Sequence, residues 1–238
     1  MIYFDLIDST NLYAKKHFQK LADQELIVAG SQTDGHGQHG RKWISPSGNI
    51  YASFILKNVQ SPFLGIIASS LATLSFVRFF CPDTEFYIKW PNDIYYSTFK
   101  IAGILSEFVS SPNISGLIVG IGVNIDMSET ELAFIDTPAA SIYSILHKRI
   151  DAKEILVDFE ERLKIYAMKL RQEPDILFQQ WKNENRLLHK DVDFLTANQT
   201  LKSGYFEDIS NDGAALIRME DGNLLKFLGG DIRLHIVS

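Results

Sequence analysis

The segment from Gly35 to Trp43, GHGQHGRKW, is the densest group of chemically capable residues in this chain. Three of its nine positions are glycine, whose bare backbone N–H groups can wrap around an anion, and Arg41 and Lys42 add full positive charges. The spacing matches neither a P-loop nor a dinucleotide-binding fingerprint. The segment therefore indicates either a site for a phosphate or carboxylate or a mobile hairpin connection.

The motif KWPND, residues 89–93, combines an indole, a proline, an amide and a carboxylate. Proline fixes its own backbone, so the turn holds Asn92 and Asp93 in a defined place where both can meet a ligand. The same residues also fit a core tryptophan, Trp90, followed by an ordinary turn. The motif predicts one of these two arrangements.

Two later motifs, KIAGILSE (100–107) and VGIGVNI (119–125), place glycines inside predicted strands. Lys100 begins the first motif, where its ammonium can stabilise a developing negative oxygen, although it also fits a surface lysine on an edge strand. Gly103 in one strand and Gly122 in the other remove side chains from the sheet. Two strands with bare backbone predict a slot for a flat molecule.

Hydrophobic periodicity predicts the elements that position these motifs. Ser9 or Thr10 is expected to cap a first helix, Pro62 to open a second, and Asp151 to cap a third. After about Leu188 the sequence changes to short strands with glycine turns, which is typical of a small all-β unit. The predicted strands are 2–7, 25–33, 49–56, 85–90, 100–109 and 115–125, the long helices are 62–81, 151–170 and 174–188, and 95–99 and 110–115 are expected as turns.

Composition sets the broad class of the protein. The chain has 238 residues, 46% of them hydrophobic and 22% charged, which fits a globular protein with a substantial core. A formal net charge of −6 argues against nonspecific nucleic-acid binding. The apolar stretch at 62–80 contains serines, a threonine and Arg78, so we expect a buried helix and no membrane partner. One cysteine, Cys81, and no recognisable targeting segment favour a cytoplasmic protein.

The four motifs, in this order, resemble those of biotin protein ligases. G-R-x-W, K-W-P-N-D, K-x-x-G-I-L-x-E and G-x-G-x-N all occur, STN at 9–11 and Gln32 match further positions, and the tail from Gly204 is similar to the family's small SH3-like domain. The resemblance covers nearly the whole chain. It implies an α+β fold: a mixed-sheet catalytic domain (1–187) like that of class II aminoacyl-tRNA synthetases, then an SH3-like β-barrel (188–238).

The resemblance also implies a reaction and its residues. Biotin would be activated by ATP with Mg²⁺ as biotinyl-adenylate and transferred to a lysine of a biotin carboxyl carrier protein of a carboxylase, with no tightly bound prosthetic group. Arg41 and Lys100 are the implied catalytic residues, and Asp93 either orients the site or helps to hold the metal. The implied biotin-binding positions are Ser9, Thr10, Asn11, Gln32, Gly35, His36, Lys100, Gly103 and Gly122, and the nucleotide-binding positions are Arg41, Trp43, Asn92 and Asn124.

The sequence departs from the family pattern in two places. Many members carry arginines where this loop has His36, Gln38 and His39, so the loop holds less permanent charge. The catalytic motif begins at Ser9, which leaves no room ahead of it for a DNA-binding segment, so no nucleic-acid partner is expected. A monomer and a homodimer are both compatible with the predicted strands.

Two other functions compete with this interpretation. A lipoate-protein ligase or octanoyl transferase has a similar catalytic fold but needs a long apolar tunnel, whereas STN and Gln32 point to a compact polar head group. A biotin sensor without catalysis would have no use for Arg41 and Lys100. Pyrophosphate release from biotin and ATP separates the three.

Overall fold

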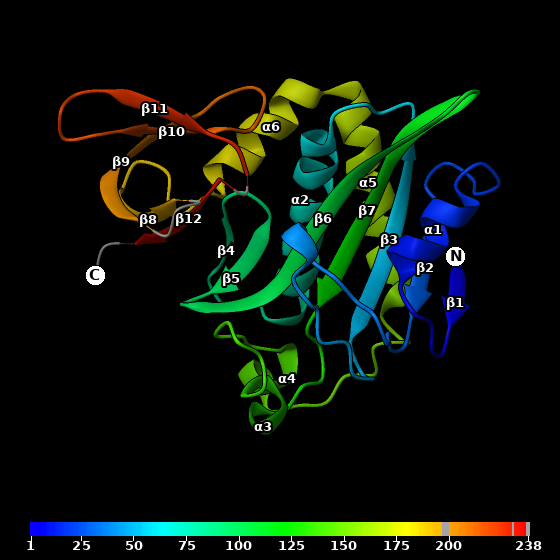
Figure 1. The fold of residues 1–238 in the computed structure, drawn as a ribbon. Helices are drawn as coiled ribbons and strands as arrows, with labels where there is room; N and C mark the ends of the chain where they lie inside the picture. Colours follow the sequence, from blue (N-terminus) through cyan, green and yellow to red (C-terminus); the bar gives the residue numbers. More distant parts are fainter. Residues whose placement is uncertain (197–199, 230, 237–238) are drawn as a thin grey trace.

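The structure is a computed structural model that describes residues 1–196, 200–229 and 231–236. Within these residues two sheets and six α-helices form an α+β fold (Figure 1). Strands of the larger sheet are β1 (Ile2–Phe4), β2 (Leu26–Ala29), β3 (Ile50–Lys57), β4 (Phe86–Lys89), β5 (Asp93–Tyr96), β6 (Phe99–Ser111) and β7 (Ile114–Val123). The helices are α1 (Thr10–His17), α2 (Pro62–Phe80), α3 (Glu129–Leu132), α4 (Ile142–Leu146), α5 (Leu156–Gln172) and α6 (Pro174–Asn183).

The larger sheet has the strand order β1-β2-β3-β7-β6-β5-β4. Strands β1 and β2 are parallel and the other neighbouring strands are antiparallel, so the sheet is mixed, as expected. Side chains alternate between its two faces: Phe54 and Leu56 of β3 join the main core, while Ile55 packs in a smaller cluster with α1. The sheet is therefore covered by helices on both faces.

Helix α2 is the central helix of the main core. It is long and apolar enough to cross a membrane by length and composition, but 72% of its apolar window is buried inside the fold, which confirms the prediction of a buried helix. It packs against α5, where the rings of Phe76 and Phe159 meet edge to face at 4.9 Å. Pro62 occupies the first helical turn, as the sequence predicts.

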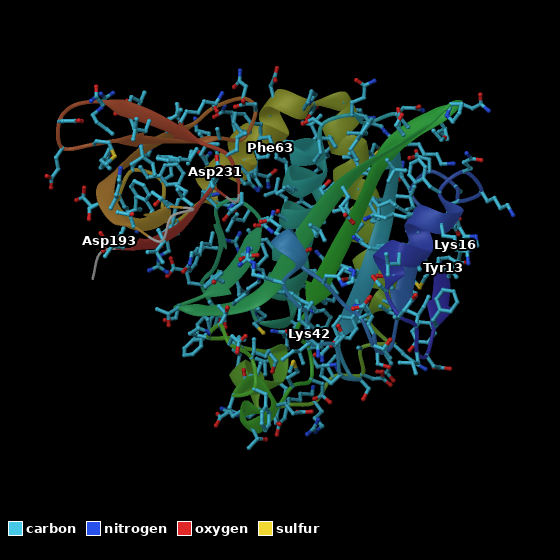
Figure 2. The ribbon with its side chains drawn as sticks, viewed as in Figure 1. Tyr13, Lys16, Lys42, Phe63, Asp193 and Asp231 are labelled. Atoms are coloured by element: carbon cyan, nitrogen blue, oxygen red, sulfur yellow. The ribbon has the colours of Figure 1, made fainter. Side chains whose placement is uncertain are left out.

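A second sheet of five strands follows α6. Its strands are β8 (Asp191–Thr196), β9 (Leu201–Ile209), β10 (Ala215–Arg218), β11 (Leu224–Phe227) and β12 (Ile232–Ile236), in the order β11-β10-β9-β8-β12, and all neighbouring pairs are antiparallel. Phe63 of α2 lies where this sheet meets the helices (Figure 2). The indole Nε1 of Trp90 donates a hydrogen bond to the carbonyl of Gly213 at 2.9 Å, so the two sheets share a continuous core.

Several sequence-based assignments differ from the structure. Of the turn expected at 110–115 only 112–113 lie between β6 and β7, and the helix expected at 174–188 ends at Asn183. Residues 95–99 were expected as a turn, but Tyr95 and Tyr96 belong to β5 and only the two residues after them turn. Asp151 was expected to begin a helix, but its carboxylate accepts a hydrogen bond from the backbone of Lys153 within a turn, and α5 begins at Leu156. The first helix, α1, is capped by Ser9, one of its two expected caps, and α3 and α4 were not predicted.

Candidate active site

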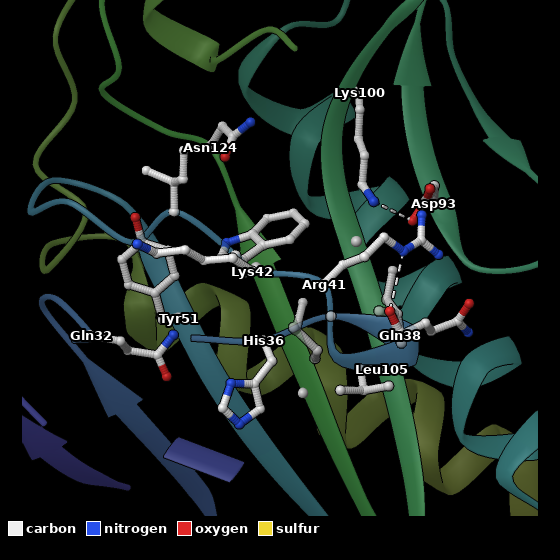
Figure 3. Close-up of a pocket in the computed structure, with 18 of the residues that line it drawn as sticks. Gln32, His36, Gln38, Arg41, Lys42, Tyr51, Asp93, Lys100, Leu105 and Asn124 are labelled. Atoms are coloured by element: carbon white, nitrogen blue, oxygen red, sulfur yellow. Dashed lines mark hydrogen bonds and ion pairs between the residues drawn. The ribbon is translucent and has the colours of Figure 1, made fainter. Parts of the chain in front are cut away.

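One cavity of about 420 Å³ opens above strands β6 and β7, beneath the loop that contains the glycine-rich segment. Figure 3 shows Gln32, His36 and Tyr51 at one end of it and Arg41, Asp93 and Lys100 at the other. The structure therefore brings together residues that lie as far as 130 positions apart along the chain, Ser9 and Ala139. Predicted site residues in its wall are Ser9, Thr10, Asn11, Gln32, His36, Arg41, Trp43, Asn92, Asp93, Lys100, Gly103, Gly122 and Asn124.

The glycine-rich segment folds as a hairpin over the cavity. The backbone of Gly37 donates to the carbonyl of Arg41 at 2.7 Å, and that of Trp43 donates to the carbonyl of Gly35 at 2.8 Å. Gly35 was expected to contact the ligand but lies behind the wall, where a Cβ would be 2.6 Å from Oγ of Ser45. The side chain of His39 lies outside the part of the chain that the structure describes.

The indole of Trp43 lies over the bare backbone of the central strands. Gly103 and Gly122 are cross-strand partners. A Cβ at Gly122 would be 2.5 Å from Cε2 of Trp43, and one at Gly103 would be 3.0 Å from its Cζ3. The two glycines do form a slot for a flat group, and here the slot holds a side chain of the protein itself.

Lys100 lies at the end of the cavity that also holds Asp93 and Arg41, and contacts of both its backbone and its ammonium hold it there. Its backbone donates to the carbonyl of Pro138 and accepts from the amide of Ala140, each at 2.9 Å. Its Nζ lies 2.7 Å from Oδ1 of Asp93 and 5.1 Å from the centre of the Trp43 ring. An ammonium placed between a carboxylate and an aromatic face can be drawn toward an anion in the cavity.

Arg41 supplies a second cation at the same end. Its side chain is exposed, its Nε donates to the carbonyl of Gln38 at 3.2 Å, and Figure 3 shows it extending toward Asp93. The cavity wall as a whole carries the cations Arg41, Lys42 and Lys100 against the acids Asp93 and Asp136, which leaves a net positive charge. This end of the cavity suits a phosphate or carboxylate group.

The other end of the cavity is a hydrogen-bonded polar group at the start of α1. Ser9 caps the helix, and its Oγ accepts from the backbone of Leu12 at 3.5 Å. Oε1 of Gln32 accepts from the backbone of Thr10 at 2.9 Å, and Nε2 of Gln32 donates to Oγ of Ser45 at 3.2 Å. Ser9, Thr10 and Ser45 are buried and Gln32 is partly buried, so these hydroxyl and amide groups can recognise a compact polar head group.

Asn92 and Asn124 line the cavity with amides that are already engaged. Nδ2 of Asn92 donates to the carbonyl of Ile104 at 2.5 Å, and Nδ2 of Asn124 donates to the carbonyl of Ala140 at 3.0 Å. Both residues therefore fix the backbone around Lys100. Their direct contact with a nucleotide remains a prediction, and it would use the amide oxygen or the second N–H of each amide.

Sequence reasoning missed several wall residues. Ile135, Asp136, Thr137 and Ala139 lie in an irregular segment without a motif, and only its pairing with the backbone at Lys100 brings it to the site. Tyr51 was assigned only to a strand; its hydroxyl donates to the carbonyl of Pro46, and burial raises its pKa, so it stays neutral.

The acids in the cavity wall are Asp93 and Asp136. Asp93 is paired with Lys100, and within the described residues no group of three or more His, Cys, Asp or Glu side chains is placed to hold a metal ion. The residues therefore do not fit a metal held by the protein alone. A divalent cation would have to arrive on an anionic substrate.

Comparisons of the sequence and of the structure with known proteins lead to the same family. Residues 3–124 match the model of the Biotin/lipoate A/B protein ligase family. The chain is 26% identical over 238 residues to the bifunctional ligase/repressor BirA of Salmonella typhimurium, covering 97% of this chain and 72% of the relative. It is 34% identical over 164 residues to the biotin--[acetyl-CoA-carboxylase] ligase of Paracoccus denitrificans, covering 63% and 65%. The structure of the biotin protein ligase of Aquifex aeolicus in complex with biotin and ATP aligns with a TM-score of 0.81 at 27% identity, covering 99% of this chain and 98% of that one.

Proposed function

The chain belongs to the Biotin/lipoate A/B protein ligase family, and we propose that it is an ATP-dependent biotin protein ligase. One observation carries the proposal: a single cavity joins a compact polar end at Thr10 and Gln32 to a cationic end at Arg41 and Lys100. Biotin has a polar ureido ring at one end and a carboxylate at the other. The cavity therefore matches the substrate in polarity and places the carboxylate beside both cations.

The first step is an acyl activation. An oxygen of the biotin carboxylate attacks the α-phosphorus of ATP, the bond from that phosphorus to the bridging oxygen of the β-phosphate breaks, and pyrophosphate leaves with the electron pair. Negative charge is concentrated on the phosphoryl oxygens during this exchange. Lys100 and Arg41 stabilise that charge, and the hairpin holds the reactants in line.

The second step transfers the acyl group. The neutral amine of an acceptor lysine attacks the carbonyl carbon of the adenylate, the carbon–oxygen bond to AMP breaks, and the amine proton passes to solvent. No covalent enzyme intermediate is required. The indole of Trp43 would move from its slot to cover the adenylate and exclude water.

The remaining residue roles follow from their place in the cavity. Ser9, Thr10, Asn11 and Gln32 would bind the ureido ring, with His36, Gly103 and Gly122 shaping the path to the carboxylate. Asn92 and Asn124 would face the nucleotide with their oxygens. Mg²⁺ would enter with ATP as part of the substrate and neutralise phosphate charge, with Asp93 as the nearest acid at the cationic end.

The acceptor and the setting of the enzyme belong to the same proposal. The acceptor is a biotin carboxyl carrier protein or domain, because the relative from Paracoccus is named for acetyl-CoA carboxylase. Residues 1–187 would form the catalytic domain and 188–238 an SH3-like domain. The protein would act in the cytoplasm as a monomer or homodimer.

The decisive test is substrate-dependent pyrophosphate release. Purified protein is mixed with ATP, Mg²⁺ and either biotin or lipoate, and a carrier domain is then added and analysed by mass spectrometry. The proposal expects pyrophosphate with biotin and a carrier mass increased by one biotinyl group. Release with lipoate alone would assign the other branch of the family, and binding of biotin without pyrophosphate would assign a sensor.

A further inference from the structure

Glu107 ends the motif KIAGILSE but has no role in the reaction described above. It lies on β6, paired across the sheet with Ile118 of β7, behind the polar end of the cavity. Its side chain is 30% exposed, so the carboxylate is partly shielded from solvent. Its contacts lead directly into the cavity wall.

The carboxylate of Glu107 holds two residues from one face of helix α1. Nδ2 of Asn11 donates to Oε2 at 2.9 Å, and Nζ of Lys15 donates to Oε1 at 2.7 Å. Asn11 and Lys15 are four residues apart, so one helical turn presents both to the same carboxylate. Asn11 itself is 8% exposed and lines the cavity.

These contacts decide which way the Asn11 amide points. An ionised carboxylate only accepts hydrogen bonds, so the NH₂ group must face Glu107 and Oδ1 must face the other way. There Oδ1 accepts from Oγ of Ser53 at 2.5 Å. The amide also lies against bare backbone, because a Cβ at Gly120 would be 2.7 Å from Oδ1.

The orientation of Asn11 in turn sets the proton direction at Thr10. Ser53 has one hydroxyl proton, and Oδ1 of Asn11 takes it because that oxygen can only accept. In the 2.8 Å contact between Ser53 and Thr10 the serine oxygen is then available only as an acceptor. The proton of Thr10 therefore goes to Ser53 and not to Oε1 of Gln32 at 3.2 Å, which leaves the lone pairs of Thr10 free to accept from a ligand N–H.

We infer that Glu107 is a positioning residue for the substrate head group: it fixes the Asn11 amide and thereby makes Thr10 an acceptor toward the cavity. This inference rests on the proposed function, because the ureido ring of biotin carries two N–H donors. Lys15 matters as a competitor for the carboxylate. Asn11 and Lys15 each use their own oxygen of Glu107, whereas with a single oxygen the amide and the ammonium would compete for the same position.

The test is Glu107→Gln, which keeps the shape of the side chain but leaves one acceptor oxygen. Lys15 takes that oxygen, the new NH₂ group faces Asn11, and the Asn11 amide turns around. We expect roughly tenfold weaker biotin binding by calorimetry without ATP, and a raised KM for biotin with little change in kcat. The matched control is Glu184→Gln, whose carboxylate also holds a cation, Arg78, at 2.7 Å.

A second variant separates positioning from simple loss of structure. Adding Lys15→Met to Glu107→Gln removes the competitor, so the single oxygen can accept from Asn11 again. We expect biotin affinity to return to within about threefold of wild type, since the lost ion pair is largely exposed. An unchanged affinity in Glu107→Gln, or a loss that Lys15→Met does not repair, overturns the role of Glu107. Wild-type protein that binds no biotin overturns the proposed function as well.

Discussion

At the scale of single residues, the ammonium of Lys100 is the charge on which activation depends. We predict that Lys100→Met lowers the rate of adenylate formation by about 10²–10³-fold, because a positioned charge on the developing phosphoryl oxygens is lost. Biotin binding should fall far less, since the polar end of the cavity is unchanged. Single-turnover pyrophosphate release and biotin calorimetry give the two quantities.

Lys226→Met is the control for that variant. Lys226 is also held 2.7 Å from a carboxylate, that of Asp212, but lies in the second sheet. It should retain wild-type activity. A Lys100→Met enzyme within a factor of about two of wild type would remove Lys100 from the mechanism.

Gln38 gives a second prediction at this scale, concerning retention of the adenylate. It lines the cavity with a neutral amide, so Gln38→Arg would add a charge at the phosphate end, and we expect adenylate dissociation to slow by roughly ten- to a hundredfold. Labelling of bystander lysines should fall in parallel. The exposed Gln179→Arg on α6 controls for added charge, and equal dissociation rates would show that hairpin closure alone retains the intermediate.

At the scale of elements, periodicity predicts the long helix α2 and the central strands because their burial follows directly from apolar spacing. The helices α3 and α4 are not predicted because each is very short. Their N-caps, Ser128 and Ser141, can be recognised as caps only once the fold of the surrounding chain is known. The site is predicted where motifs carry it, as with Lys100 and Trp43. Asp136 is not, because only tertiary pairing places its segment beside Lys100.

The contact between β7 and the hairpin gives a prediction about element packing. Gly122→Ala would put a Cβ 2.5 Å from Cε2 of Trp43, so the indole must leave its slot. We expect the free energy of unfolding in urea to fall by about 1–3 kcal/mol. In a Trp43→Ala background the same change should be nearly neutral, and equal losses in the two backgrounds would contradict the stacking of the indole on this glycine.

At the scale of the whole molecule, the two sheets are expected to act as one cooperative unit, because the motif KWPND joins them. Nε1 of Trp90 donates to the carbonyl of Gly213 in the turn between β9 and β10. Asn92 and Asp93, two and three residues after Trp90, line the cavity. A change at Trp90 should therefore reach both the stability of the second sheet and the binding of nucleotide.

Trp90→Phe tests this coupling against a matched substitution. It removes the donor and leaves the Gly213 carbonyl unpaired, so we predict a loss of about 1–3 kcal/mol in unfolding free energy beyond the loss of ring volume. Trp181→Phe measures the loss of stability from the smaller ring alone, because in the described structure the buried Nε1 of Trp181 has no hydrogen-bond partner. Urea unfolding should stay a single transition in both, with a raised KM for ATP in Trp90→Phe only. Equal stabilities of the two variants would show that apolar packing alone joins the two sheets. Separate unfolding of the second sheet in the wild-type protein would show that the sheets do not unfold cooperatively.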